Sequence, residues 1–234
     1  MLQKPRSGSL TRDREIRSVL ISKLQAKYPS AEEDLILEEF GCNTARIDVA
    51  VVNGALHGFE IKSDCDSISR LDNQLMAYEG VFDYITLVAG RKLFDTVKAM
   101  VPETCGLILA DKRKGEVVLR EKRKARKNPA QRNYDLARMM WRDEALACLR
   151  VRGHRAATSR HSAEQIWRAT ATSLEIAALA DEVRLAIKRR GGSGFAKRSE
   201  RGGDLCTTGS IALLDHYSEN LAWLLSMQSG YRPH

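Results

Sequence analysis

The stretch RIDVAVVNGALHGFEIK at residues 46–62 decides the fold of this chain. Its two apolar runs are joined by an Asn-Gly dipeptide, which predicts a β-hairpin because these residues favour the tight turns between antiparallel strands. Asp48, Glu60 and Lys62 interrupt the apolar runs. Charged side chains are rarely buried unless they are paired or bind a metal, so these residues indicate a functional site.

The length of the hairpin loop determines which face of the sheet each charged side chain occupies. Directly opposite residues of an antiparallel pair point to the same face. A two-residue loop would place Asp48 and Glu60 on opposite faces, whereas a three-residue loop at 52–54 with a left-handed Gly54 places them on one face. Lys62 follows Glu60 by two residues and shares its face. We therefore expect two carboxylates and an ammonium group to converge.

Such a group of side chains suits the hydrolysis of phosphodiesters. Two carboxylates on neighbouring strands are ligands for Mg²⁺ or Mn²⁺, which keep several waters and share their coordination with phosphate. A bound metal lowers the pKa of a water, and a nearby lysine orients that water or stabilises the developing negative charge. The alternative for Lys62 is an exposed lysine at a strand end.

The same residues resemble a known family of enzymes. Asp48 followed by Glu60-Ile61-Lys62 is similar to the signature of the PD-(D/E)xK nuclease superfamily, with Ile47 where that family often has proline. Residues 74–78, QLMAY, resemble the Q-x-x-x-Y element of the RecB-like branch. The stretch from about residue 35 to residue 90 also resembles small bacterial proteins with this core. The resemblance covers roughly a quarter of the chain.

The resemblance implies a role for further residues. Glu39, with Glu38 as a possible substitute, occupies the place where the RecB-like branch often has another carboxylate of the metal site. The carbonyl oxygen of Ile61 would be a further metal ligand, and Gln74 would help to place the substrate. Residues four apart share a helix face, so we interpret Tyr78 as a core residue with a polar tip that supports the site.

The hydrophobic periodicity predicts an α/β (α+β) fold with a C-terminal helical extension. The resemblance to the PD-(D/E)xK nucleases implies that its core is a restriction-endonuclease-like central mixed sheet flanked by helices. We expect a nuclease-like core over residues 1–120 and a basic, mainly helical region over residues 121–234. The expected strands are 35–40, 46–52, 56–62, 84–89, 106–110 and 116–119, and the expected helices are 13–27, 68–80, 92–100, 134–151, 162–189 and 209–227. The C-terminal helices could pack on the sheet or bind nucleic acid or a second protein.

Charge is distributed unevenly along the chain. Residues 1–110 carry 13 Lys and Arg against 16 Asp and Glu, whereas residues 111–234 carry 25 against 14. A metal site beside a basic surface is the division that a nuclease needs, because the surface must hold a polyanion. The densest basic run consists of Lys122, Arg123, Lys124, Arg126 and Lys127, which we interpret as nucleic-acid-binding. Its alternative is a solvated loop.

Composition limits the remaining possibilities. At 234 residues the chain can bury one core and a small second lobe. Its apolar runs are strand-sized, so we expect no signal peptide, no membrane span and no membrane partner. The five cysteines are odd in number and show no C-x-x-C spacing, which indicates a reducing cytoplasm and neither a zinc site nor a disulfide framework.

These observations predict a metal-dependent nuclease that uses Mg²⁺ or Mn²⁺, with DNA as the favoured substrate. Two other classes stay open. One is an RNA or tRNA nuclease on the same core. The other is a non-catalytic nucleic-acid-binding or assembly module in which the basic half of the chain acts. A homo-oligomer or a protein partner is compatible with each class.

Overall fold

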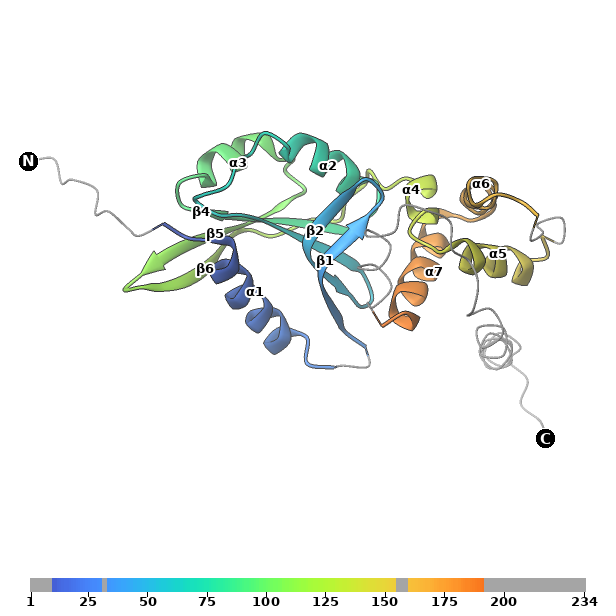
Figure 1. Ribbon diagram of the computed structural model, residues 1–234, viewed down its shortest axis with the longest axis horizontal. Helices are drawn as coiled ribbons and strands as arrows, with labels where there is room; N and C mark the ends of the chain where they lie inside the picture. Colours follow the sequence, from blue (N-terminus) through green and yellow to red (C-terminus); the bar gives the residue numbers. More distant parts are fainter. Residues whose placement is uncertain (1–9, 31–32, 155–159, 192–234) are drawn as a thin grey trace, which may run out of the picture. The chain divides into compact units, whose positions relative to one another are not determined.

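The computed structural model describes residues 10–30, 33–154 and 160–191, which contain a six-stranded mixed sheet in the order β1-β2-β3-β4-β5-β6 (Figure 1). The strands are β1 (Leu35–Cys42), β2 (Ala45–Val52), β3 (Leu56–Lys62), β4 (Tyr84–Gly90), β5 (Gly106–Arg113) and β6 (Glu116–Arg123). The first three strands pair antiparallel, β3, β4 and β5 pair parallel, and β6 returns antiparallel beside β5.

Helices cover both faces of this sheet. Figure 1 shows α1 (Asp13–Lys27) on one face and α2 (Leu71–Glu79) and α3 (Phe94–Met100) on the opposite face. The buried residues of α1 are Ile16, Leu20 and Leu24, which recur every four positions and so form one apolar stripe. The helices α2 and α3 are the crossover connections that the parallel pairs β3–β4 and β4–β5 need.

Two apolar cores follow from this layering. The smaller core lies under α1 and contains Val49, Val51, Phe59 and Ile61 of the hairpin. The larger core lies on the other face, where hairpin residues such as Ala50 and Val52 pack with buried residues of α2 and of the C-terminal helices. The hairpin therefore contributes alternate residues to both cores, as the period of a buried strand requires.

The C-terminal part of the described chain is helical, with α4 (Asn133–Ala137), α5 (Arg142–Val151), α6 (Ala163–Ser173) and α7 (Ile176–Arg189). Asp83, which is 3% exposed, connects α7 to the sheet. Its Oδ2 atom accepts a hydrogen bond from the amide of Leu56 at 2.8 Å and one from the guanidinium of Arg184 at 3.1 Å. These bonds join the helical region to the start of β3.

The predicted α/β fold class is confirmed, since a mixed sheet lies between helices and a helical region follows it. The bounds of α1 agree with the prediction, but the helices predicted over 134–151 and 162–189 are wrong because each is interrupted. Met139 and Met140 are buried in the first break, and Leu174 is extended and buried in the second. Burial of these side chains therefore outweighs helical continuity. The helix predicted over 209–227 lies outside the described residues.

The sheet also extends further than predicted at its last strand. Pairing with β5 carries β6 to Arg123, which lies opposite Leu107 across a register shift. Within the described residues, no helix has the length and apolar character needed to cross a membrane.

Candidate active site

The β2–β3 hairpin has the predicted odd loop, with a different turn. Val52 pairs with Leu56, so the loop contains Asn53, Gly54 and Ala55, one residue later than expected. The predicted left-handed Gly54 is wrong, because it is not among the described glycines with positive φ. The side chain of Asn53 accepts a hydrogen bond from the amide of Ala55 at 3.0 Å and closes the turn in place of a left-handed glycine.

Beyond this turn the two strands separate and open the site. The β2–β3 register runs from Val52↔Leu56 to Val49↔Phe59 and stops there, although β2 begins at Ala45 and β3 ends at Lys62. The remaining part of β2 pairs with β1, and the remaining part of β3 pairs with β4. The motif residues therefore lie where the backbone ladder between β2 and β3 is open.

A local irregularity in β1 and β2 coincides with this opening. Glu39 lies between the register pairs that flank Asp48, and its φ of 51° is the left-handed conformation. The alternation of faces also shifts by one here, since Ile47 and Ala50 belong to the same core. A non-glycine residue with positive φ is uncommon and carries a conformational cost, which indicates a constrained position.

Asp48 points into the gap between β2 and β3. Its Oδ2 atom accepts a hydrogen bond from the amide of Ile61 at 2.6 Å, which replaces the missing backbone acceptor. Its Oδ1 atom lies 2.6 Å from Nη2 of Arg17 on α1. The expectation that a regular ladder places Asp48 and Glu60 on one face is thus wrong in detail, because Asp48 reaches toward α1 through the open ladder.

Glu60 lies on the α2 side of the gap, in a hydrogen-bonded network. Its Oε1 atom accepts from Nζ of Lys62 at 2.6 Å and from Nε2 of Gln74 at 2.7 Å, and its Oε2 atom accepts from the hydroxyl of Tyr78 at 2.7 Å. Lys62 also donates to Oε1 of Gln74 at 2.9 Å. Lys62 is only 8% exposed, so the alternative of a solvated lysine at a strand end is wrong.

Tyr78 supports this network from below. The residue is fully buried in the larger core, and its hydroxyl also donates to the carbonyl oxygen of Arg46 at 2.8 Å. Burial and the charge of Glu60 raise the pKa of the Tyr78 hydroxyl above its ordinary value, so the phenol stays protonated as a donor. The structure therefore places Tyr78 as a core residue with a polar tip.

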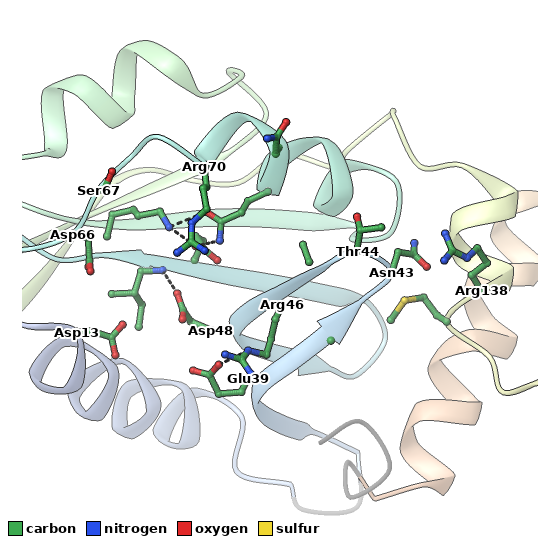
Figure 2. A pocket seen from close by; sticks show the side chains of 18 residues that line it. Asp13, Glu39, Asn43, Thr44, Arg46, Asp48, Asp66, Ser67, Arg70 and Arg138 are labelled. Atoms are coloured by element: carbon green, nitrogen blue, oxygen red, sulfur yellow. Dashed lines mark hydrogen bonds and ion pairs between the residues drawn. The ribbon is translucent and has the colours of Figure 1, made fainter. Parts of the chain in front are cut away.

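The two halves of the site face one cavity of about 1110 Å³ (Figure 2). The cavity is lined by six of the predicted site residues: Glu39, Asp48, Glu60, Ile61, Lys62 and Gln74. Asp48 and Glu60 approach this cavity from different sides of the open ladder. The structure thus brings the predicted carboxylates, lysine and amide to one concave site, while Tyr78 lies beneath it.

Glu39 lies at the exposed edge of the cavity, between two arginines. Its Oε1 atom is 2.8 Å from Nη1 of Arg17, and its Oε2 atom is 2.7 Å from Nε of Arg46. Arg17 also contacts Asp13, one helical turn earlier on α1, which lines the cavity too. Sequence analysis missed Asp13 and Arg17, although acidic and basic residues four apart beside the α1 stripe were a visible signal.

The electrostatics of the site suit a bound cation. Burial, together with the negative charge of Glu60, raises the pKa of Asp48 to about 6. Mg²⁺ commonly uses one or two carboxylates together with waters and substrate phosphate, and Asp48 and Glu60 are two carboxylates that line this cavity. At present Arg17 and Lys62 neutralise these carboxylates, so a metal would have to displace Arg17 from Asp48.

No group of three or more His, Cys, Asp or Glu residues suited to a metal ion occurs in the part of the chain that the structure describes. The donor set is therefore smaller than a closed protein cage, which needs most of its ligands from side chains. A cation here would take the rest of its coordination from water and substrate.

The basic run at 122–127 lies elsewhere, and much of it is bonded to the protein. Arg123 donates to the carbonyl oxygens of Cys105 and Pro102 at 2.7 and 2.8 Å. Arg126 pairs with Glu103 at 3.1 Å, and Lys127 lies 3.6 Å from Asp83. None of these three cations lines the cavity, and neither do Lys122 and Lys124. Their assignment to nucleic-acid binding stays a prediction.

Comparison with known proteins identifies the family of the chain. Residues 6–200 match the family described as Bacteriophage P4 protein cII. The chain belongs to this family. The match includes every described strand and helix, so the sheet, the cavity and the helical region are parts of one cII-family unit.

Two individual proteins are similar to this cII-family chain. Protein cII of Enterobacteria phage P4 is 35% identical over 102 residues, which are 43% of this chain and 39% of that protein. The chain therefore matches well under half the length of this relative. A solved structure, the SPO1766 protein of unknown function from Silicibacter pomeroyi, is 18% identical, covers 65% of this chain and 99% of its own, and has a TM-score of 0.38.

Proposed function

We propose that this protein is a Mg²⁺-dependent nuclease that hydrolyses phosphodiester bonds, with DNA as its favoured substrate. The observation that carries the proposal is the open β2–β3 ladder, where Asp48, Glu60 and Lys62 face one cavity. Buried ion pairs contribute little to stability compared with apolar residues of similar size. A buried Glu60–Lys62 pair at a cavity is therefore better explained by chemistry than by packing.

The proposed roles follow from the contacts of each side chain. Asp48 and Glu60 would hold the metal, with the Ile61 carbonyl oxygen and Glu39 as further ligands by resemblance to the PD-(D/E)xK nucleases. A bound Mg²⁺ would lower the pKa of a water and neutralise charge on the phosphate. Lys62 would orient the attacking water or stabilise the developing negative charge.

The surrounding network positions Lys62 for this role. Glu60 and Gln74 both accept hydrogen bonds from Nζ of Lys62, which fixes the ammonium at the cavity wall. Tyr78 holds Glu60 from the core side. Because Gln74 also donates to Glu60, it sets the orientation of both charged groups, and its place on the wall suits contact with substrate.

Incubation of purified protein with plasmid and linear DNA, with Mn²⁺ or with EDTA, tests the proposal. We expect the wild type and Lys98→Ala to cleave only with metal, since Lys98 is an exposed lysine on α3 away from the cavity. Lys62→Ala should lose about 10²-fold or more of the rate. Absence of metal-dependent cleavage by the wild type, or a wild-type rate for folded Lys62→Ala, would contradict it.

The identity of the nucleic acid is tested separately. An RNA or tRNA nuclease would use the same carboxylates and lysine. Cleavage of single-stranded DNA, duplex DNA and RNA is therefore compared at equal salt concentration, because phosphate contacts make binding strongly salt-dependent. Faster cleavage of RNA than of DNA would identify RNA as the favoured substrate.

A second candidate is a non-catalytic nucleic-acid-binding or assembly module. The observation that favours it is the pairing of Asp48 with Arg17, and of Glu39 with Arg17 and Arg46, which holds these carboxylates in ion pairs without any metal. Calorimetric titration with Mn²⁺ separates the two candidates. Binding at millimolar concentrations or below supports the nuclease, and its absence favours the module.

A further inference from the structure

Two arginines that line the cavity, Arg70 and Arg138, make no ion pair within 4.0 Å with a carboxylate of the described residues. Arg70 lies at the start of α2 and is exposed, and Arg138 lies at the end of α4 and is half-buried. Neither makes an ion pair with the described carboxylates, whereas the other cavity cations, Arg46 and Lys62, pair with Glu39 and Glu60. The cavity therefore contains two guanidinium groups that are not held in an ion pair with a described carboxylate.

The two arginines are separated along the cavity. Figure 2 shows Arg138 beside Asn43 and Thr44 of the β1–β2 turn, and Arg70 away from them, over the part of the cavity that Asp48 lines. The neutral donors Asn43 and Asn73 also line the wall. Positive charge at two separate places, with polar donors along the wall, suits an extended polyanion better than one small anion.

We propose that Arg70 and Arg138 bind backbone phosphates of a nucleic-acid strand that runs along this cavity. Arg70 contacts a phosphate near the carboxylates, and Arg138 contacts a more distant one toward the β1–β2 turn. This inference rests on the proposed function, because it identifies how that same site holds its substrate. It also gives the helical region a role, since Arg138 belongs to α4.

The strand path differs from the one that the basic run at 122–127 predicts. Arg123, Arg126 and Lys127 are bonded to the protein, and their contacts with residues 102–105 and Asp83 explain their positions without a ligand. Arg70 makes no contact of this kind with the described residues, and Arg138 stacks over the ring of Tyr134 at 5.8 Å, which leaves its hydrogen-bond donors available. A guanidinium is the side chain best suited to phosphate, because its fork of donors matches two phosphate oxygens.

The test measures binding of the full-length protein to a fluorescein-labelled DNA duplex with a single-stranded extension, by anisotropy in EDTA over a range of KCl concentrations. Arg70→Ala and Arg138→Ala should each weaken binding about tenfold. Each should also reduce the slope of log K against log salt by about 0.7 to 0.9, the contribution of one phosphate contact. Arg70→Lys, which keeps the charge, should retain the slope.

The matched control is Lys98→Ala, which removes an exposed lysine of α3. We expect it to bind within about twofold of the wild type, because this lysine lies outside the cavity. Circular dichroism checks that each variant is folded. Unchanged slopes for both arginine variants, or a loss confined to the lysine variant, would overturn the inference.

The experiment also separates this inference from the nuclease proposal. No cleavage occurs in EDTA, so binding is read independently of chemistry. If the wild type never cleaves with Mn²⁺ but both arginine variants show the reduced salt slope, the strand path stands and the nuclease does not. If the wild type cleaves and the arginine variants bind normally, the nuclease stands and the strand path does not.

Discussion

Arg17 and Asp48 are joined by an ion pair of 2.6 Å, although α1 and β2 hold them 31 residues apart in the chain. The guanidinium also donates to the carbonyl oxygen of Asp48 at 2.9 Å. Arg17 is therefore the cation that now balances the carboxylate which the nuclease proposal assigns to a metal. Its position makes competition between the arginine and a metal measurable.

Arg17→Met should increase the affinity for Mn²⁺ about tenfold, because the metal no longer has to displace a guanidinium from Asp48. The metal-free variant should be less stable than the wild type by about 2 kcal/mol, since it leaves carboxylates without a partner. Calorimetric titration and thermal unfolding with and without Mn²⁺ measure both effects.

Arg14→Met is the matched control, because Arg14 lies on the same helix and is exposed. It should change neither Mn²⁺ affinity nor stability beyond about 0.5 kcal/mol. Equal Mn²⁺ affinity of Arg17→Met and the wild type would show that the arginine and the metal do not compete.

Tyr78→Phe should remove about 1 to 2 kcal/mol of stability, since the hydroxyl donates to Glu60 and to the Arg46 carbonyl while the ring fills the core. Urea unfolding measures this loss. Tyr84→Phe is the control, because Tyr84 has the same hydroxyl without a described hydrogen bond, and it should be close to neutral. A neutral Tyr78→Phe would contradict the supporting role.

Sequence patterns were sufficient to predict the sheet and the convergence of the main site residues. Apolar runs of period two and an Asn-Gly turn depend on local chemistry, so the hairpin and its odd loop are readable before the fold is known. The pairing of Glu60 and Lys62 follows from strand alternation, and their meeting with Gln74 was predicted from the family motif alone. These features need little knowledge of distant contacts.

The remaining features could not be predicted from the sequence, because they depend on tertiary contacts. The side chain of Asp48 departs from the regular alternation of faces, because the β2–β3 ladder opens beside it and the amide of Ile61 needs an acceptor there. Arg17 meets Asp48 only because α1 packs on the sheet. The sequence of the basic run at 122–127 indicates a binding surface, yet three of its five cations contact the loop at residues 102–105 or Asp83. Charge density in sequence does not show which charges are already paired.

Because burial disfavours the charged form of His57, we expect the protein to lose stability in mild acid. Burial lowers its pKa to about 3, and the charge of Lys27 acts in the same direction. Below pH 6.5 the unfolded chain binds a proton that the folded protein does not, so stability falls as the pH decreases from 6.5 toward 3. Between pH 6.5 and 5 this loss should reach about 1 to 2 kcal/mol.

The comparison of wild type with His57→Gln isolates this effect. Glutamine keeps a polar group near Thr86, whose hydroxyl lies 2.8 Å from Nε2 of His57, but does not titrate. Urea unfolding at several pH values should give a smaller decrease for the variant than for the wild type over this range. Parallel pH curves would assign the acid sensitivity to other groups.

Asp83→Asn tests the connection between the sheet and the C-terminal helices. The amide keeps an acceptor for the Leu56 amide but loses the charge that pairs with Arg184, which is largely buried. We expect the free energy of unfolding to decrease by about 1 to 3 kcal/mol, the range for a hydrogen bond to a charged group. Asp95→Asn, at an exposed position on α3, should be neutral.

The Asp83→Asn variant also tests whether Asp83 positions the DNA-binding arginine at the end of α4. Because the helical region that Asp83 connects to the sheet includes Arg138, we expect Asp83→Asn to weaken DNA binding in EDTA as well. A lower free energy of unfolding with unchanged DNA binding would show that Asp83 stabilises the fold without positioning Arg138.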